Sequence, residues 1–376
     1  MKIRKIAAAA SALVLAASLV SCGEKTDTVK PDLSTEKVTE AETAEKAAET
    51  EAPDADTTES VSEVTTEPDP TSLAHNPLTG EYGYNADAVG KRPVAVMINN
   101  IDQSLPQYGI SSADYIYEVV VEGGITRLMA VFGDYTNVPT LCSIISCRYY
   151  YPLIANGLDA IYCHWGMDMT IAKETLERLG IDRFDGDNSS DGLFYNDENR
   201  LEYYAREHTG CLDGSQLPAS IENAGFRTEA KNGGADYMKF AEGTEFLDIS
   251  DEDCESMTLT FSESYFSTFT YDSETKTYLK QHSGSPHMDA SNEKQLAFTN
   301  VFALKTDVYL RDDGYRMDVE LDGGEGYYFS GGKVKAINWT KSGDDSNFRF
   351  TDAETGDEIT VNRGKCYIGI TQRVSF

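Results

Sequence analysis

The sequence predicts an α/β domain followed by a mostly antiparallel β domain, carried on an exported chain. Three observations lead to this prediction. An apolar leader ends in a cysteine, strand-like and helix-like runs alternate up to about residue 240, and short alternating runs with little helix follow. We expect four regions, with boundaries at 1–22 (leader), 23–72 (tether), 73–240 (α/β domain) and 241–376 (β domain).

The leader combines a positive start with a short apolar run. Lys2, Arg4 and Lys5 precede residues 6–20, a run shorter than the about 20 residues that a membrane span needs. The run ends in Leu19-Val20-Ser21-Cys22, which resembles a bacterial lipoprotein box. We therefore expect cleavage before Cys22, a lipid on its thiol, and anchoring at the extracytoplasmic face of the cell membrane. An uncleaved anchor and an ordinary secreted protein are the alternatives.

The tether has a composition that cannot form a core. Residues 24–70 contain no aromatic residue, and they carry 15 acidic and 4 basic side chains. Such a segment buries too little apolar surface to offset the entropy of ordering, so we expect it to be disordered. A helix over residues 39–52 is the alternative, but that segment offers no apolar stripe.

The net charge is strongly negative, at −31 for the whole chain. The leader contributes +3 and the tether −11, which leaves −23 for residues 71–376. This balance argues against nucleic acid as a partner and against electrostatic adhesion to anionic lipid. The membrane contact that we expect is therefore the N-terminal lipid, and no residue pattern indicates a cofactor.

Six cysteines follow Cys22, and their pairing is open. In an exported chain an even number of cysteines is consistent with disulfides, and six cysteines can pair in 15 ways. The sequence has no Cys-x-x-Cys, and several cysteines lie in apolar runs, where a free thiol serves as a small apolar side chain. We expect buried thiols in preference to disulfides. The six are Cys142, Cys147, Cys163, Cys211, Cys254 and Cys366.

The α/β region shows four strands and two helices. Runs rich in β-branched and aromatic residues predict strands at 92–99, 114–122, 125–134 and 158–165. Helical spacing of apolar residues predicts helices at 170–180 and 215–225, each ending at a glycine suited to a C-cap.

The stretch Val-Val-Val-Glu-Gly-Gly-Ile-Thr-Arg at 119–127 predicts a tight hairpin. Two glycines can both adopt positive φ, as a two-residue turn requires. In that register Val120 lies opposite Arg127, and Glu122 lies opposite Ile125. The C-terminal region predicts further hairpins at 271–278 and 351–360.

An ordered string of motifs resembles the bacterial YerB-like lipoproteins. It includes Asn-Pro-Leu-Thr-Gly-Glu at 76–81, Arg-Pro-Val-Ala-Val-Met-Ile-Asn-Asn at 92–100, and the longer stretches 106–132 and 146–166. The resemblance spans 76–370 and implies a lipoprotein with an N-terminal α/β domain and a C-terminal β-rich domain. The resemblance does not indicate which biochemical activity the chain has. This chain departs from the family's Arg-Ser-Ala-Arg motif by having isoleucine at its first position, residue 145.

Four polar residues form the candidate ligand-binding set: Glu122, Arg127, Arg148 and His164. Together they could bind an anionic or hydroxyl-rich ligand. His164 closes a predicted strand shortly before a predicted helix start near Asp168, which is where α/β proteins place ligands. The alternative is that all four are structural residues of turns and strand ends.

Residues 187–198 resemble a calcium loop more weakly. Asp187, Ser189, Asp191 and Glu198 occupy positions 1, 3, 5 and 12 of an EF-hand-like spacing, with Gly192 at position 6. The resemblance described above favours an ordinary loop for this segment.

No catalytic motif is visible: the chain lacks Gly-x-Ser-x-Gly, His-Glu-x-x-His, a P-loop and a dinucleotide-binding glycine motif. The leading hypothesis is a non-enzymatic lipoprotein that binds an envelope component, either a cell-wall polymer or an envelope protein. The alternative is a cell-wall-active enzyme with Glu122 or His164 as acid/base. A third hypothesis is a calcium-stabilised structural module.

Overall fold

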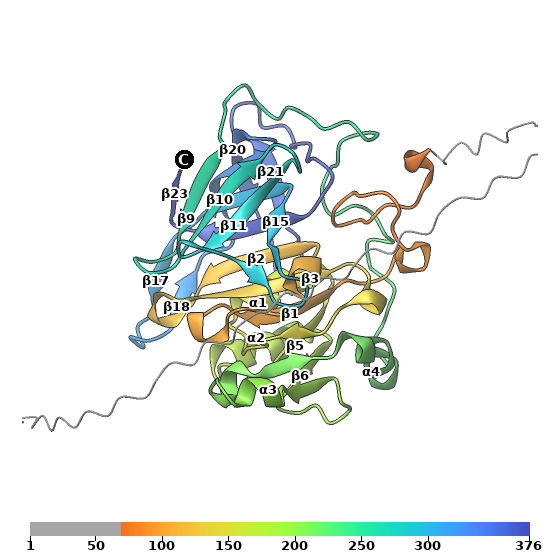
Figure 1. Ribbon diagram of the computed structural model, residues 1–376, viewed down its shortest axis with the longest axis vertical. Helices are drawn as coiled ribbons and strands as arrows, with labels where there is room; N and C mark the ends of the chain where they lie inside the picture. The colour runs from red at the N-terminus through yellow and green to blue at the C-terminus, as the bar shows by residue number, and fades with distance from the viewer. Residues whose placement is uncertain (1–68) are drawn as a thin grey trace, which may run out of the picture. The chain divides into compact units, whose positions relative to one another are not determined.

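The computed structural model describes residues 69–376 (Figure 1). The predicted leader, the lipidation site Cys22 and nearly all of the predicted tether lie outside the described residues. Among the residues from 69 onward, no helix combines the length and apolar character that crossing a membrane requires.

A ten-stranded mixed sheet organises the described part of the chain. Strand β22, near the C-terminal end, pairs in parallel with β16 on one side and with β2 on the other. The strands, in their order across the sheet, are β21 (Arg349–Asp352), β20 (Lys333–Thr340), β19 (Gly323–Ser330), β16 (Asn300–Lys305), β22 (Cys366–Thr371), β2 (Tyr115–Val120), β3 (Thr126–Phe132), β1 (Val94–Asn99), β5 (Ile161–His164) and β6 (Arg183–Asp185).

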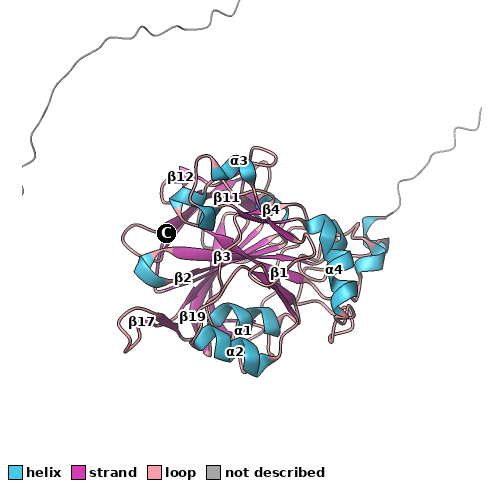
Figure 2. Cartoon of the chain, turned by 90° about the horizontal axis from the view of Figure 1, so that it is seen from below, coloured by secondary structure: helices cyan, strands magenta, loops and turns pink. Residues whose placement is uncertain are grey.

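The two faces of this sheet bury different partners. Alternation along β1 directs Ala95 and Met97 to one face, where helices α1 (Tyr150–Gly157) and α2 (Ile171–Leu179) pack (Figure 2). The residues between them, such as Val96, face the opposite side. Both faces of β1 are therefore buried, which explains why its residues from Val94 to Ile98 are all apolar.

A second, antiparallel sheet covers the opposite face (Figures 1 and 2). Its residues Leu259 and Phe269 share a core cluster with Tyr367 of the central sheet. The strands are β12 (Ser285–Pro286), β11 (Thr277–His282), β10 (Phe266–Asp272), β9 (Ser256–Thr260) and β23 (Arg373–Ser375), with β15 (Ala297–Phe298) paired to β11.

Smaller elements complete the fold. Three strands form a separate small sheet in the order β4 (Leu141–Cys142), β8 (Gly210–Leu212) and β7 (Phe194–Asn196). The others are helices α3 (Glu198–Leu201) and α4 (Leu217–Ala224), the pairs β13 (Met288–Asp289) with β14 (Lys294–Gln295) and β17 (Val308–Leu310) with β18 (Met317–Val319), and the 3-10 turns Pro70–Ser72, Ala86–Ala88, Asp102–Ser104, Ile110–Ser112, Glu122–Gly124, Tyr135–Asn137, Arg206–His208 and Gly214–Gln216.

The predicted fold class is confirmed: a mixed α/β region is followed by a mostly antiparallel β region. The four N-terminal strands and both helices lie where the sequence predicts them, and the helices end at Gly180 and Gly225, which have positive φ. The hairpin of β10 and β11 is also confirmed. The central sheet contains strands from both sides of residue 240, so the two sequence regions share one sheet.

The predicted two-residue turn at Gly123-Gly124 is wrong. The ladder closes at Val120 opposite Thr126, so residues 121–125 form the connection, and Arg127 lies opposite Val119 instead of Val120. Both glycines do have positive φ, but they belong to a 3-10 turn that includes Glu122. The start of the connection is itself buried, with Val121 at 0% and Glu122 at 8% exposed.

The preference for free thiols is wrong for two of the six cysteines. Cys142 of β4 and Cys211 of β8 form a disulfide with their Cα atoms 4.4 Å apart, within the range that such a bond requires. The two cysteines are 69 residues apart in the chain, so their spacing gave no local signal. The other four, Cys147, Cys163, Cys254 and Cys366, are buried free thiols.

Candidate functional site

An ion pair joins two of the four predicted ligand-binding residues. The Nε atom of Arg148 lies 2.7 and 2.8 Å from the two carboxylate oxygens of Glu122. Burial acts to lower the pKa of Arg148, but the hydrogen bond and charge of Glu122 outweigh it and raise that pKa. The Arg148 guanidinium is therefore charged, and both oxygens of Glu122 lie within hydrogen-bond distance of it.

Arg127 lies beside this pair and points to the same loop. Its Nη1 atom donates to the main-chain oxygen of Ser146 and lies 3.2 Å from the Ser146 hydroxyl. Arg148 reaches that hydroxyl as well, at 3.4 Å from its own Nη1. Burial and the neighbouring positive charge of Arg148 lower the pKa of Arg127. Two guanidiniums thus converge on Ser146.

His164 makes no hydrogen bond or ion pair with the other three residues. Strand β1 lies between β3, which carries Arg127, and β5, which ends at His164, so these two strands are two strand spacings or roughly 10 Å apart. The segment that follows His164 does pair with the segment that precedes Arg148, because the main-chain N–H of Trp165 donates to the oxygen of Ile145 at 3.1 Å. The Nδ1 atom of His164 lies 2.9 Å from the main-chain oxygen of Gly166, and Nε2 is buried without a hydrogen-bond partner. Burial lowers the pKa of His164, which favours the neutral ring.

A cavity of about 410 Å³ opens where Ser146 meets the loop after β5. Its lining combines an indole ring, a hydroxyl, two carboxylates, an amide and a guanidinium, contributed by Ser146, Trp165, Asp187, Asn196, Arg206 and Glu207. Ser146 therefore connects the cavity to Arg127 and Arg148, although neither arginine lines it. We call this the Trp165 cavity.

Trp165 is held in one orientation. Its Nε1 atom donates to Asp187 at 3.0 Å, and its ring meets Phe194 edge-on with centroids 5.7 Å apart. A Cβ atom at Gly186 or Gly210 would lie 2.4 or 2.7 Å from the ring, so only glycine leaves room for it. Trp165 escaped the sequence prediction, although a tryptophan directly after a strand end was a usable signal.

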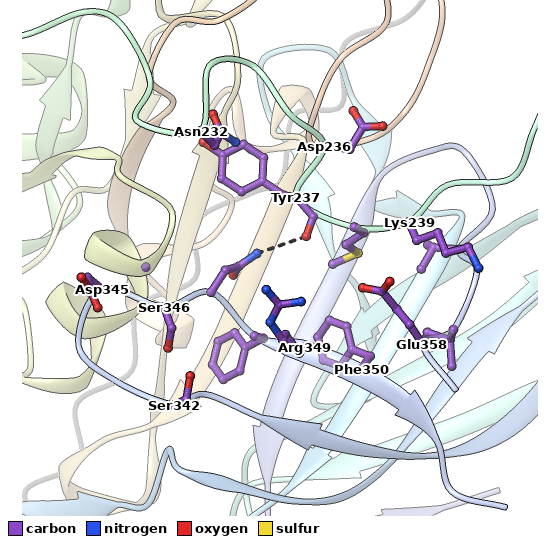
Figure 3. Close-up of a pocket in the computed structure, with 16 residues that line it drawn as sticks. Asn232, Asp236, Tyr237, Lys239, Ser342, Asp345, Ser346, Arg349, Phe350 and Glu358 are labelled. Atoms are coloured by element: carbon purple, nitrogen blue, oxygen red, sulfur yellow. Dashed lines mark hydrogen bonds between the residues drawn. The ribbon is translucent and has the colours of Figure 1, made fainter. Parts of the chain in front are cut away.

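A second cavity, of about 570 Å³, lies between the segment 232–239 and the strand β21 with its flanking loops (Figure 3). Figure 3 shows Arg349 pointing into it, with Lys239 and Glu358 nearby. Asn347 closes one wall by donating to the main-chain oxygen of Tyr237 at 3.3 Å. None of the residues predicted from the sequence lines this cavity.

In the possible calcium loop at residues 187–198, two carboxylates already accept hydrogen bonds from other protein groups. Asp187 accepts the Trp165 hydrogen bond, while Asp191 accepts from the hydroxyls of Ser189 and Ser220 at 2.6 Å each. Glu198 begins helix α3 after strand β7, so the segment does not wrap around one point. Within residues 69–376, no three His, Cys, Asp or Glu side chains are grouped to hold a metal ion.

Comparison with known proteins places the fold in a family. Residues 78–227 match the N-terminal domain, and residues 257–368 the C-terminal domain, of a family described as protein of unknown function (DUF3048). A Bacillus subtilis (strain 168) protein named "Putative lipoprotein YerB" is 26% identical over 318 residues, which cover 81% of this chain and 88% of that protein. The crystal structure of YerB from Bacillus subtilis matches with a TM-score of 0.68 at 24% identity, covering 81% of this chain and all of that one.

Proposed function

We propose that this chain, which belongs to the DUF3048 family of proteins of unknown function, is a lipid-anchored extracytoplasmic protein that binds a hydroxyl-rich cell-wall polymer at the Trp165 cavity. The anchor is supported by the sequence Leu19 to Cys22 and by the Bacillus subtilis relative, which is named "Putative lipoprotein YerB". Replacing Cys22 by alanine should move the protein from the membrane fraction to the soluble fraction. Retention of that variant on membranes would exclude a lipid anchor at Cys22.

The observation that carries the binding proposal is the fixed Trp165 ring inside a polar cavity. Sugars present an apolar face of C–H groups, which stacks on aromatic rings, and a rim of hydroxyls. Asp187, Asn196 and Glu207 supply acceptors for such hydroxyls, and Arg206 supplies a cation for a carboxylate on the polymer. A pre-oriented aromatic side chain with convergent polar groups is the usual composition of a ligand site.

Glu122, Arg127 and Arg148 act in this proposal as positioning residues. They hold Ser146, and with it one wall of the cavity, through the contacts of both guanidiniums to its hydroxyl and main chain. Glu122 keeps Arg148 in place. Since both Glu122 oxygens bind Arg148 and His164 is fully buried, neither residue is free to carry a proton to a bound polymer, which favours binding over catalysis.

Sedimentation with insoluble peptidoglycan tests the proposal. Trp165→Ala should bind at least about tenfold more weakly, because stacking of one ring is worth about 1.5 kcal/mol. Arg127→Ala should also weaken binding, through the loss of support for Ser146. Tyr315→Ala is the matched control, since that aromatic residue is 61% exposed on another hairpin. Unchanged binding by Trp165→Ala would overturn the proposal, and release of soluble fragments by the wild type would favour the enzyme alternative.

A further inference from the structure

A second polar cluster lies in the core between the two sheets, away from the Trp165 cavity. It contains a lysine amine, a carboxylate and a carboxamide: Lys280 on β11, Glu118 on β2, and Asn100 directly after β1. Their exposed fractions are 0%, 1% and 0%. Burying a lysine this completely is costly unless its partners are well placed, so the arrangement calls for a reason.

Glu118 holds the other two groups with its two oxygens. Oε2 lies 3.4 Å from Nζ of Lys280, and Oε1 lies 3.2 Å from Nδ2 of Asn100. Strand β11 runs beside Asn100, because His282, two residues after Lys280, has Nδ1 at 3.4 Å from the same Nδ2 atom. One carboxylate thus bridges a buried amine and a buried amide.

The surroundings favour a reactive amine. Burial lowers the pKa of Lys280, more than the charge of Glu118 raises it. The amine lies 3.0 Å from Nδ1 of His287, and 5.7 Å from the ring centroid of Tyr367. Burial raises the pKa of Glu118, but the charges and hydrogen bonds around it outweigh burial and lower that pKa, so the carboxylate starts the reaction unprotonated, beside the amine of Lys280.

We propose that Lys280 and Asn100 react to form an isopeptide bond, with Glu118 as the proton carrier. Glu118 first takes a proton from the Lys280 ammonium, and the neutral Nζ attacks Cγ of Asn100. Protonated Glu118 then gives its proton to Nδ2 and recovers one from Nζ as the Cγ–Nδ2 bond breaks. Nδ2 leaves as ammonia, and a Cγ–Nζ amide remains. No oxidant, metal or cofactor is needed.

The bond would link the second sheet covalently to the central sheet. The two residues are 180 positions apart in the chain, so the cross-link closes a long loop and lowers the entropy of the unfolded chain. An exported protein outside the reach of cytoplasmic quality control gains resistance to unfolding and proteolysis from such a link. The inference is independent of the proposed polymer binding.

Peptide mapping of the reduced full-length protein by mass spectrometry tests it. Trypsin cuts after Lys91 and Arg127, so Asn100 lies in the peptide 92–127. An acylated Lys280 resists trypsin, so that residue stays within 277–294. We expect one species that joins these two peptides, with a mass one ammonia below their sum, and fragment ions that place the link on Asn100 and Lys280.

Two variants complete the test. Glu118→Gln keeps both reacting side chains but cannot carry the proton, so we expect the linked species to disappear. Lys341→Met, a change at another buried lysine, should leave the linked species unchanged. Separate, unmodified 92–127 and 277–280 peptides from the wild type would overturn the proposal, whatever the variants do. A linked species that has lost water would also overturn it, because that loss places the bond on Glu118.

Discussion

Arg148 and Glu122 form an ion pair that is largely shielded from water, with 14% and 8% of their side chains exposed. Arg127 packs against the same loop, so the carboxylate of Glu122 offsets two neighbouring positive charges. The short connection between β2 and β3 places this carboxylate, because Glu122 begins a 3-10 turn and is not part of the ladder. The pair therefore depends on a turn geometry that a simple hairpin would not have produced.

Removing the Glu122 charge should destabilise the fold. Glu122→Gln leaves two buried guanidiniums without a counter-charge, and we expect a loss of about 3 kcal/mol in the free energy of unfolding. Urea denaturation followed by circular dichroism measures it. Glu177→Gln is the control, because Glu177 pairs with Lys173 on an exposed helix face, where the loss should be about 0.5 kcal/mol or less. Equal losses in the two variants would contradict the buried-pair interpretation.

Filling the space behind Trp165 should disturb the cavity. In Gly186→Ala the new Cβ would lie 2.4 Å from the indole ring, so the ring must move and lose its hydrogen bond to Asp187. We expect peptidoglycan binding to weaken about tenfold, with a shift in tryptophan fluorescence. Gly343→Ala is the control, since its Cβ would have only one neighbour, at 3.7 Å. Wild-type binding by Gly186→Ala would show that the ring position does not matter.

Asp114 should make stability depend on pH in a defined window. Burial raises the pKa of this carboxyl to about 6, against 3.8 as its ordinary value, despite hydrogen bonds from Gly133 and Asn76. Between about pH 4 and pH 6 the folded state therefore binds more protons than the unfolded state. The contribution of Asp114 to the free energy of unfolding is present below pH 4 and is lost as the pH rises through 6.

Comparison with Asp114→Asn isolates this effect, because the other titrating groups are common to both proteins. Denaturation at several pH values should show the stability of the wild type falling by about 2 kcal/mol relative to the variant between pH 4 and pH 7. A stability difference that stays constant across this range would mean that the pKa of Asp114 is not raised.

The Cys142–Cys211 disulfide should contribute to both stability and binding. Its 69-residue separation predicts a loss of about 4 kcal/mol when both cysteines are replaced by alanine. Residues 144–146 and Gly210, which line the Trp165 cavity, lie close to these cysteines in the chain, so binding should weaken as well. Replacing the free thiol Cys254 by alanine is the control.

A thiol count checks the same bond directly. In the wild-type protein, denatured without reductant, four of the six cysteines that follow Cys22 should react with a thiol reagent. After reduction all six should react. Six thiols before reduction would show that Cys142 and Cys211 are not joined.

The amino-acid sequence alone was enough to predict the strands β1, β2, β3 and β5, the helices α2 and α4 and the change to β structure near residue 240, but it did not predict α1. These features are determined locally, by the spacing of apolar residues, by β-branched side chains and by a glycine at a helix end. The sequence also grouped Glu122, Arg127 and Arg148, together with His164, as one candidate set, but the turn that places Glu122 against Arg148 differs from the predicted hairpin.

Only the tertiary structure could place β22 between β16 and β2, join Cys142 to Cys211, and bring Lys280 to Glu118. Each of these contacts connects residues far apart in the chain. Such contacts form because the burial of a whole sheet face is favourable, and any single residue contributes little to that burial. For the same reason His164, which the sequence grouped with the arginines, ends a strand two positions away from the strand of Arg127, and Trp165, one residue later, lines the cavity.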